Sequence, residues 1–127
     1  MRDDGLVSAL VMALLALAGL LCLAVADAAN VLVARARAQS AADAAALAAA
    51  VAQWPFVARD EEPTKAAEQV AKDNGATLEA CECPLRGTSA TVTVSVPTRI
   101  RLLGVAPSRV DARATSALDV GRVFEPP

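Results

Sequence analysis

The clearest pattern along the chain is an apolar run without a charged side chain over residues 5–26. Leu, Val, Ala and Met make up most of it. As an α-helix rising about 1.5 Å per residue, this run would be about 33 Å long, which is enough to cross the hydrocarbon core of a bilayer. The pattern therefore predicts a protein that is held in a membrane or has been delivered across one.

The helical pattern continues beyond this run, because neither Gly nor Pro occurs between Leu20 and Pro55 and alanine is abundant. Alanine has the highest helix propensity. We expect one helix from Gly5 to Gln53 that ends before Pro55, with its first half in lipid and its second half in water.

Three side-chain stripes follow from helical spacing along this element. Small residues in lipid allow two helices to approach closely, and the apolar run carries such a stripe. A second stripe is expected to pack the globular part against the helix, and a third is a solvated, hydrogen-bonded face. The small-residue stripe is Gly5, Ala9, Ala13 and Ala16. The packing stripe is Leu47, Val51 and Trp54, and the solvated stripe is Arg35, Gln39 and Asp43.

After the helix, the pattern predicts a small head made of one short helix and three antiparallel strands. The short helix is expected over 63–73, because Pro suits a first helical turn and Asn74-Gly75 can end the helix. Residues 77–83, 90–96 and 110–117 alternate with a period of two, as strands do. The fold class is thus α+β, with segments 1–54 (membrane and stalk helix), 55–118 (head) and 119–127 (a tail expected to be disordered).

The first strand does not alternate cleanly. Leu78 and Ala80 would share one face, while Glu79, Cys81 and Cys83 would share the other. Either a β-bulge or an edge position in the sheet would explain this pattern.

Composition excludes several kinds of function. A net charge of −2 provides no basic field for nucleic acid, and the three aromatic side chains are too few for base stacking. Without His or Tyr, the chain lacks His-based acid–base catalysis and most zinc sites. The glycines are isolated, so no phosphate-binding loop is present. We therefore expect no enzyme, cofactor, metal, nucleic acid or small-molecule substrate.

Cys81 and Cys83 are a candidate disulfide in the head, whereas Cys22 lies in the apolar run. Two residues apart on a regular strand, Cα atoms lie near the upper limit for a disulfide, so a bond would require a local turn. Pro84 makes such a turn plausible. An intrachain bond, a free pair and an intermolecular bridge all stay open.

The apolar run has three competing interpretations. Ala24-Val25-Ala26 matches a signal-peptidase site, and Cys22 could end a lipoprotein signal, although Leu21 stands where a small residue is expected. The third is a retained anchor. We favour the anchor because the run is longer than the usual signal core of about 7–15 residues and cleavage would cut a strong helical pattern.

The sequence resembles the TadE/TadG-like proteins of tight-adherence (Tad) pilus systems, and most of all their short actinobacterial branch, the helicase/secretion-neighbourhood TadE-like proteins. Asp4-Gly5 before the apolar run carries part of the resemblance, and residues 33–48, VARARAQSAADAAALA, carry the most specific part. Residues 70–76, 92–96 and 112–114 add weaker similarity. The resemblance implies a non-enzymatic, pseudopilin-like minor component of a Tad-type pilus or secretion apparatus. Its partners would be the membrane, other pilin-like subunits and the Tad machinery.

The resemblance also implies a single-pass topology, with the N-terminus cytoplasmic and the head extracytoplasmic. Two departures from the family pattern matter. Many relatives carry Glu five residues after the processing glycine, where Leu10 stands here, so neither cleavage at Gly5 nor Glu-mediated docking is predicted. Relatives also often place a cysteine in the short helix, which has none here, so Cys81 and Cys83 would pair with each other.

Two other functions compete with this interpretation. The runner-up is a small secreted binding module released by cleavage after Ala26. An enzyme using Glu79, Glu82 or Asp111 is a distant third, because the sequence places no second acidic partner beside any of them.

Overall fold

A computed structural model describes residues 3–54, 62–99 and 102–119. Its five elements form the α+β fold predicted from the sequence: a long helix, a short helix and one antiparallel sheet with strand order β1-β2-β3. Pro55, which is predicted to stop the long helix, lies outside the described residues, and so does the predicted disordered tail apart from Asp119. The elements are α1 (Asp3–Ala52), α2 (Pro63–Asp73), β1 (Thr77–Glu82), β2 (Ser89–Pro97) and β3 (Arg109–Ala117).

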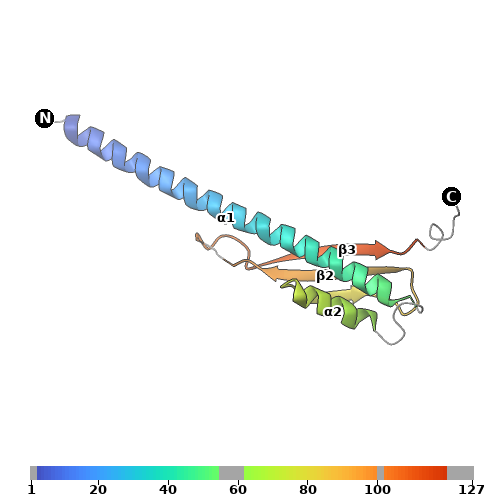
Figure 1. Ribbon diagram of the computed structural model, residues 1–127. Coiled ribbons are helices and arrows are strands. Elements are labelled where there is room, and N and C mark those ends of the chain that lie inside the picture. The colour runs from blue at the N-terminus through green and yellow to red at the C-terminus, as the bar shows by residue number, and fades with distance from the viewer. Residues whose placement is uncertain (1–2, 55–61, 100–101, 120–127) are drawn as a thin grey trace.

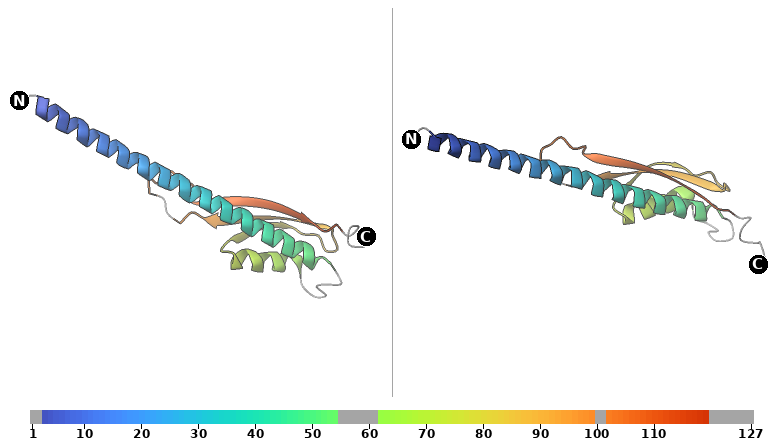
Figure 2. Two further views of the ribbon diagram at one scale, coloured as in Figure 1. Left: turned by 45° about the horizontal axis from the view of Figure 1, so that its top comes forward. Right: turned by 90° about the horizontal axis from the view of Figure 1, so that it is seen from above.

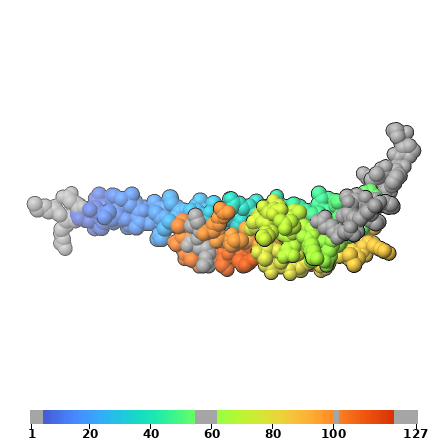
Figure 3. All heavy atoms as spheres, turned by 60° about the horizontal axis from the view of Figure 1, so that its bottom comes forward, coloured from blue at the N-terminus to red at the C-terminus, as the bar shows by residue number. Residues whose placement is uncertain are grey.

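The molecule is elongated because α1 extends far beyond the rest of the structure (Figures 1 and 2). The sheet and α2, together called the head, pack along the C-terminal half of α1. The N-terminal part, residues 5–25, is exposed at every position. Figure 3 shows this bare helix continuing past the point where the head ends. We call residues 5–26 the bare segment.

The core of the head lies between the sheet and one face of α1. Val92 and Val94 of β2 are fully buried there, as the alternation predicted. On the helix side the core consists of alanine alone, and we call these residues the alanine face: Ala34, Ala38, Ala41, Ala42, Ala45, Ala46, Ala49 and Ala50.

The predicted packing stripe of Leu47, Val51 and Trp54 is therefore wrong. Leu47 is 54% exposed, and Val51 and Trp54 are only half-buried. Methyl side chains allow α2 and the sheet to approach the α1 backbone closely, and a leucine on that face would hold them apart. The helix turns alanine inward for this reason and leaves its larger side chains outside.

The strand β1 combines both explanations considered for its irregular pattern. It is an edge strand, and its register with β2 shifts between Leu78 and Ala80, which is a β-bulge at Glu79. The bulge reverses the alternation. Leu78 and Cys81 consequently both pack against the core, while Ala80 is exposed. The prediction that Leu78 shares a face with Ala80 and lies opposite Cys81 is therefore wrong.

The two ends of α2 follow from local chemistry. Pro63 occupies its first turn, where the missing amide hydrogen costs nothing. At its other end the amide of Ala76 donates to Ala71 O and that of Gly75 to Lys72 O, each at 2.9 Å. This is a Schellman cap, and Gly75 accommodates its positive φ of 71°. The bounds predicted for this helix are confirmed.

Replacing Ala45 by Leu tests the close packing of the alanine face. Ala45 is fully buried, so the added carbons must push the sheet or α2 away, at a cost of about 1–3 kcal/mol. We expect a lower urea midpoint for the detergent-solubilised full-length protein, followed by Trp54 fluorescence. Ala36→Leu is the control, because Ala36 is exposed on the same helix. Equal midpoints for the two variants would contradict the packing described here.

Candidate functional site

The bare segment is the first candidate surface, because its leucines and valines are exposed all around the helix. Soluble proteins rarely expose a continuous apolar surface of this size unless something else covers it. Among the described residues, one helix, α1, is long and apolar enough to cross a membrane. The members of the predicted small-residue stripe, Gly5, Ala9, Ala13 and Ala16, are all exposed within it and touch nothing in the head.

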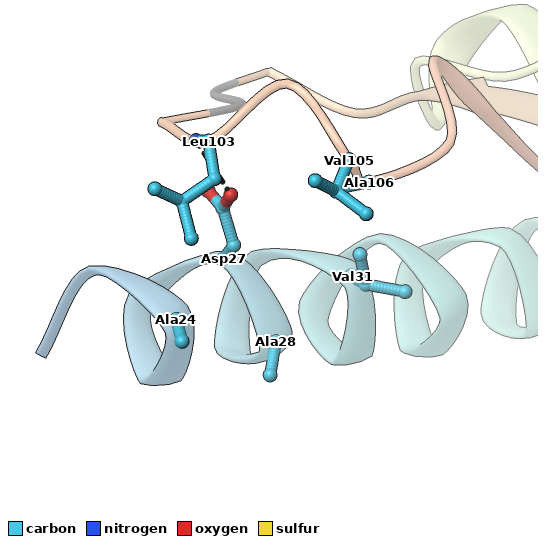
Figure 4. A pocket seen from close by; sticks show the side chains of 7 residues that line it. All are labelled: Ala24, Asp27, Ala28, Val31, Leu103, Val105 and Ala106. Carbon is cyan, nitrogen blue, oxygen red and sulfur yellow. Dashed lines mark hydrogen bonds between the residues drawn. The ribbon is translucent and has the colours of Figure 1, made fainter. Parts of the chain in front are cut away.

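Asp27 stands directly after the bare segment, and it is the residue that fastens the head at this point. It is only 6% exposed. One of its carboxylate oxygens accepts the backbone N–H of Leu102 at 2.7 Å and the other accepts that of Leu103 at 2.8 Å. Figure 4 shows the carboxylate directed at the β2–β3 connection, which runs beside the helix. Residues 75 positions apart in the chain are joined in this way.

The backbone of the connection is shaped to present two successive amides. Gly104 follows them with φ +72°, a conformation that glycine adopts without the steric cost of a side chain. At the base of the connection, the amide of Thr98 donates to Ser108 O at 2.9 Å, next to the ends of β2 and β3. The amides of Leu102 and Leu103 therefore face the helix at the level of Asp27.

The energy of this contact is large for a single side chain. Hydrogen bonds to a charged group contribute about 1.5–3 kcal/mol each, and a buried carboxylate left without donors would be costly. Sequence reasoning missed this role. A signal was available: Asp27 is the first charge after the bare segment, and neither Leu23, Asn30 nor Val31, its neighbours on the helix, supplies a cation.

A shallow groove of about 320 Å³ lies beside Asp27, between α1 and the connection. Its walls are apolar except for the carboxylate, and Figure 4 shows them converging from the two elements. The lining residues are Ala24, Asp27, Ala28, Val31, Leu103, Val105 and Ala106.

A second polar contact joins α1 to the head at the opposite end. Gln53 is buried and donates from Nε2 to Ser89 O at 3.1 Å. The β1–β2 turn packs tightly beside it, since a Cβ added at Gly87 would lie 2.7 Å from Pro84 Cγ and 3.2 Å from Gln53 Oε1. The head is thus held by hydrogen bonds at both ends of its contact with α1.

Cys81 and Cys83 are joined by a disulfide in this structure, with Cα atoms 5.3 Å apart. A regular strand would separate them by about 6.6 Å, so the chain contracts where β1 ends at Glu82. Both sulfurs pack against the edge of the core. Cys22 is a free thiol, exposed in the bare segment.

The acidic residues considered for catalysis do not form a reaction centre. Glu79 pairs with Arg109 at 3.3 Å and Glu82 with Arg113 at 3.1 Å, and these side chains are about half exposed or more, on the outer face of the sheet. Asp111 is also exposed. Across residues 3–54, 62–99 and 102–119, no three His, Cys, Asp or Glu side chains gather in a way that could hold a metal ion.

The solvated face predicted on α1 is present in part. Gln39 donates from Nε2 to Asp43 Oδ1 at 3.0 Å, one helical turn further along. Arg35, the third member of the predicted stripe, is exposed. This face therefore looks away from the head.

Comparison with known proteins finds a similarity over the long helix. A family model described as putative Flp pilus-assembly TadE/G-like matches residues 5–52. No curated protein and no solved structure matches the chain. The TadE-like resemblance predicted from the sequence is confirmed over these residues. They coincide with α1 and include the bare segment, Asp27 and the alanine face.

Replacing Asp27 by Ala should release the connection from the helix. Without the carboxylate, the amides of Leu102 and Leu103 lose their acceptors, and their hydrogen exchange should accelerate by about tenfold or more. Asp43→Ala is the matched control, because this carboxylate of the same helix is exposed and accepts a hydrogen bond from Gln39, which lies on the helix itself. Exchange that stays slow at both amides in Asp27→Ala would contradict the role given to Asp27.

The state of Cys81 and Cys83 can be measured by mass spectrometry of protein taken from native envelopes. Alkylation without reduction should label Cys22 alone, and reduction should raise the number of labelled thiols to three. Three labels without reduction would exclude the bond. A dimer that disappears on reduction would instead indicate an intermolecular bridge.

Proposed function

We propose that the protein is a non-enzymatic, minor pseudopilin-like component of a Tad-type pilus or secretion apparatus, anchored in the membrane and assembled through α1. The observation that carries this proposal is that the TadE/G-like match, over residues 5–52, falls on the long helix α1. The match covers the bare segment, whose exposed apolar side chains need lipid or protein to cover them. It also covers the alanine face, against which the head packs.

The bare segment would act as both anchor and assembly surface. In lipid, its exposed leucines and valines are stable on all sides, and helices associate mainly through close packing. Gly5, Ala9, Ala13 and Ala16 offer the least bulky side of the segment. We propose this side as the contact with neighbouring pilin-like helices.

The proposed topology places the N-terminus in the cytoplasm and the head outside. The joined Cys81 and Cys83 support this orientation, since disulfides persist outside the cytoplasm. The predicted boundary at residue 54 would separate two functions, anchoring by the helix and the function of the head. It would not separate two independently packed parts of the structure. The alanine face supplies one side of the core of the head, so residues 34–52 and the head would act as one body.

A secreted module cleaved after Ala26 agrees less well with these contacts. Cleavage would cut α1 immediately before Asp27 and remove Ala24 from the wall of the groove. The carboxylate that fastens the connection would then lie at a frayed chain end. These contacts favour a retained anchor.

Affinity purification of the full-length protein from native membranes tests the proposal. Intact mass should show that residues 5–26 are retained, and pilin-like subunits or Tad machinery should co-purify. Ala13→Ile should weaken that co-purification, because it adds bulk to the small-residue side. Ala18→Ile is the control, lying about 140° away around the same segment at about 100° per residue.

Two results would contradict the proposal in different ways. A soluble chain that begins at Asp27 would favour the secreted module. A membrane-retained chain whose partners are lost equally in Ala13→Ile and Ala18→Ile would show that the small-residue side is not the assembly surface.

A further inference from the structure

The β2–β3 connection exposes apolar side chains where a soluble loop would be polar. Leu102 and Leu103 are about half exposed, and Val105 is 86% exposed. Neighbouring Gly104 carries no side chain that could shield them. An exposed apolar group of this kind indicates a surface that is covered by something else.

The position of the connection along α1 indicates what covers it. The hydrogen bonds from Leu102 and Leu103 to Asp27 hold it at the end of the bare segment. Leu103 shares the groove with Ala24, inside that segment, and Val105 lies near Val31 (Figure 4). Ala24 and Val31 are about 10 Å apart along the helix axis, close to the depth of a bilayer's interfacial layer.

The apolar surface of the connection is continuous with that of the bare segment. Figure 3 shows the connection lying against the helix beside its bare part. Leu20 and Leu23 are exposed on the side of the helix that faces the connection, so a phase that covers them extends toward Leu103 as well. A bilayer meets this requirement without a second protein.

Two cations lie further toward the head than the apolar side chains, with Arg37 about 9 Å past Val31 along the axis of α1. Arg99 of the connection and Arg37 of α1 line one shallow depression, and both are exposed. Apolar side chains followed by arginine are typical of elements that lie in a membrane interface, where the cations meet lipid phosphates.

We propose that the β2–β3 connection is a second membrane contact, with Leu102, Leu103 and Val105 inserted into the lipid boundary on the head side of the bilayer. Asp27 holds the connection at that depth, and Arg37 and Arg99 face the headgroups. The head is consequently fixed against the membrane surface at one end. This inference rests on the proposed insertion of the bare segment in a bilayer.

Single-tryptophan variants of the full-length protein test this contact. In a Trp54→Phe background, Leu102→Trp and Val105→Trp report on the connection in vesicles of phosphatidylglycerol with brominated acyl chains. We expect blue-shifted emission and strong bromine quenching at both, deeper for Leu102→Trp. Leu85→Trp is the control: Leu85 is 78% exposed in the β1–β2 turn, at the opposite end of the sheet, and should show several-fold less quenching.

A fourth probe, Leu15→Trp in the middle of the bare segment, separates the possible failures. An unquenched Leu15→Trp would show that the segment is not in the bilayer, which overturns the proposed anchor and this inference together. A quenched Leu15→Trp with Leu102→Trp and Val105→Trp no more quenched than Leu85→Trp overturns this inference alone. Blue-shifted, unquenched emission at both connection probes that rises with protein-to-lipid ratio would assign the connection to a second copy, and would also overturn it.

Discussion

The structure depends on one helix that has to satisfy two surroundings without a break. Along the bare segment, α1 carries leucine and valine on every side, which suits lipid. Along residues 34–52 it turns a face made of alanine toward the head. No Gly or Pro marks the change, so the backbone continues as one rod and only the side chains differ. Everything else in the head is arranged on that second face.

Alanine on the helix determines how thin the head can be. The sheet and α2 lie close to the α1 backbone because the helix contributes nothing larger than a methyl group to the shared core. Such a core buries little apolar area per residue, which is a weakness for so small a domain. Hydrogen bonds at the two ends of the interface, accepted by Asp27 and donated by Gln53, compensate by fixing the position of the head along the helix. The disulfide between Cys81 and Cys83 restrains the end of the edge strand in addition.

Much of this architecture could be predicted from the sequence, because it depends on local patterns. The apolar run, the turn chemistry at Gly75 and the alternation of Val92 and Val94 each predicted an element that the structure contains. The contacts between distant elements could not be predicted in the same way. Helical spacing predicts that Leu47 faces inward with Val51 and Trp54, but the close approach of the sheet selects alanine. The bulge at Glu79 reverses one strand's alternation, and no local rule places it.

Asp27 shows why the candidate site was harder to predict than the fold. Its partners are backbone amides, which every residue except proline possesses, so no side-chain motif in residues 98–108 signals the contact. The useful signal is the position of a lone carboxylate at the border of an apolar segment, with no cation one turn away. Backbone donors have a further physical consequence. They carry no mobile charge of their own, and they stay in place as long as the connection keeps its shape, which Gly104 permits. The level of the head above the bare segment therefore depends on the backbone geometry of the connection and on one side chain of the helix, Asp27.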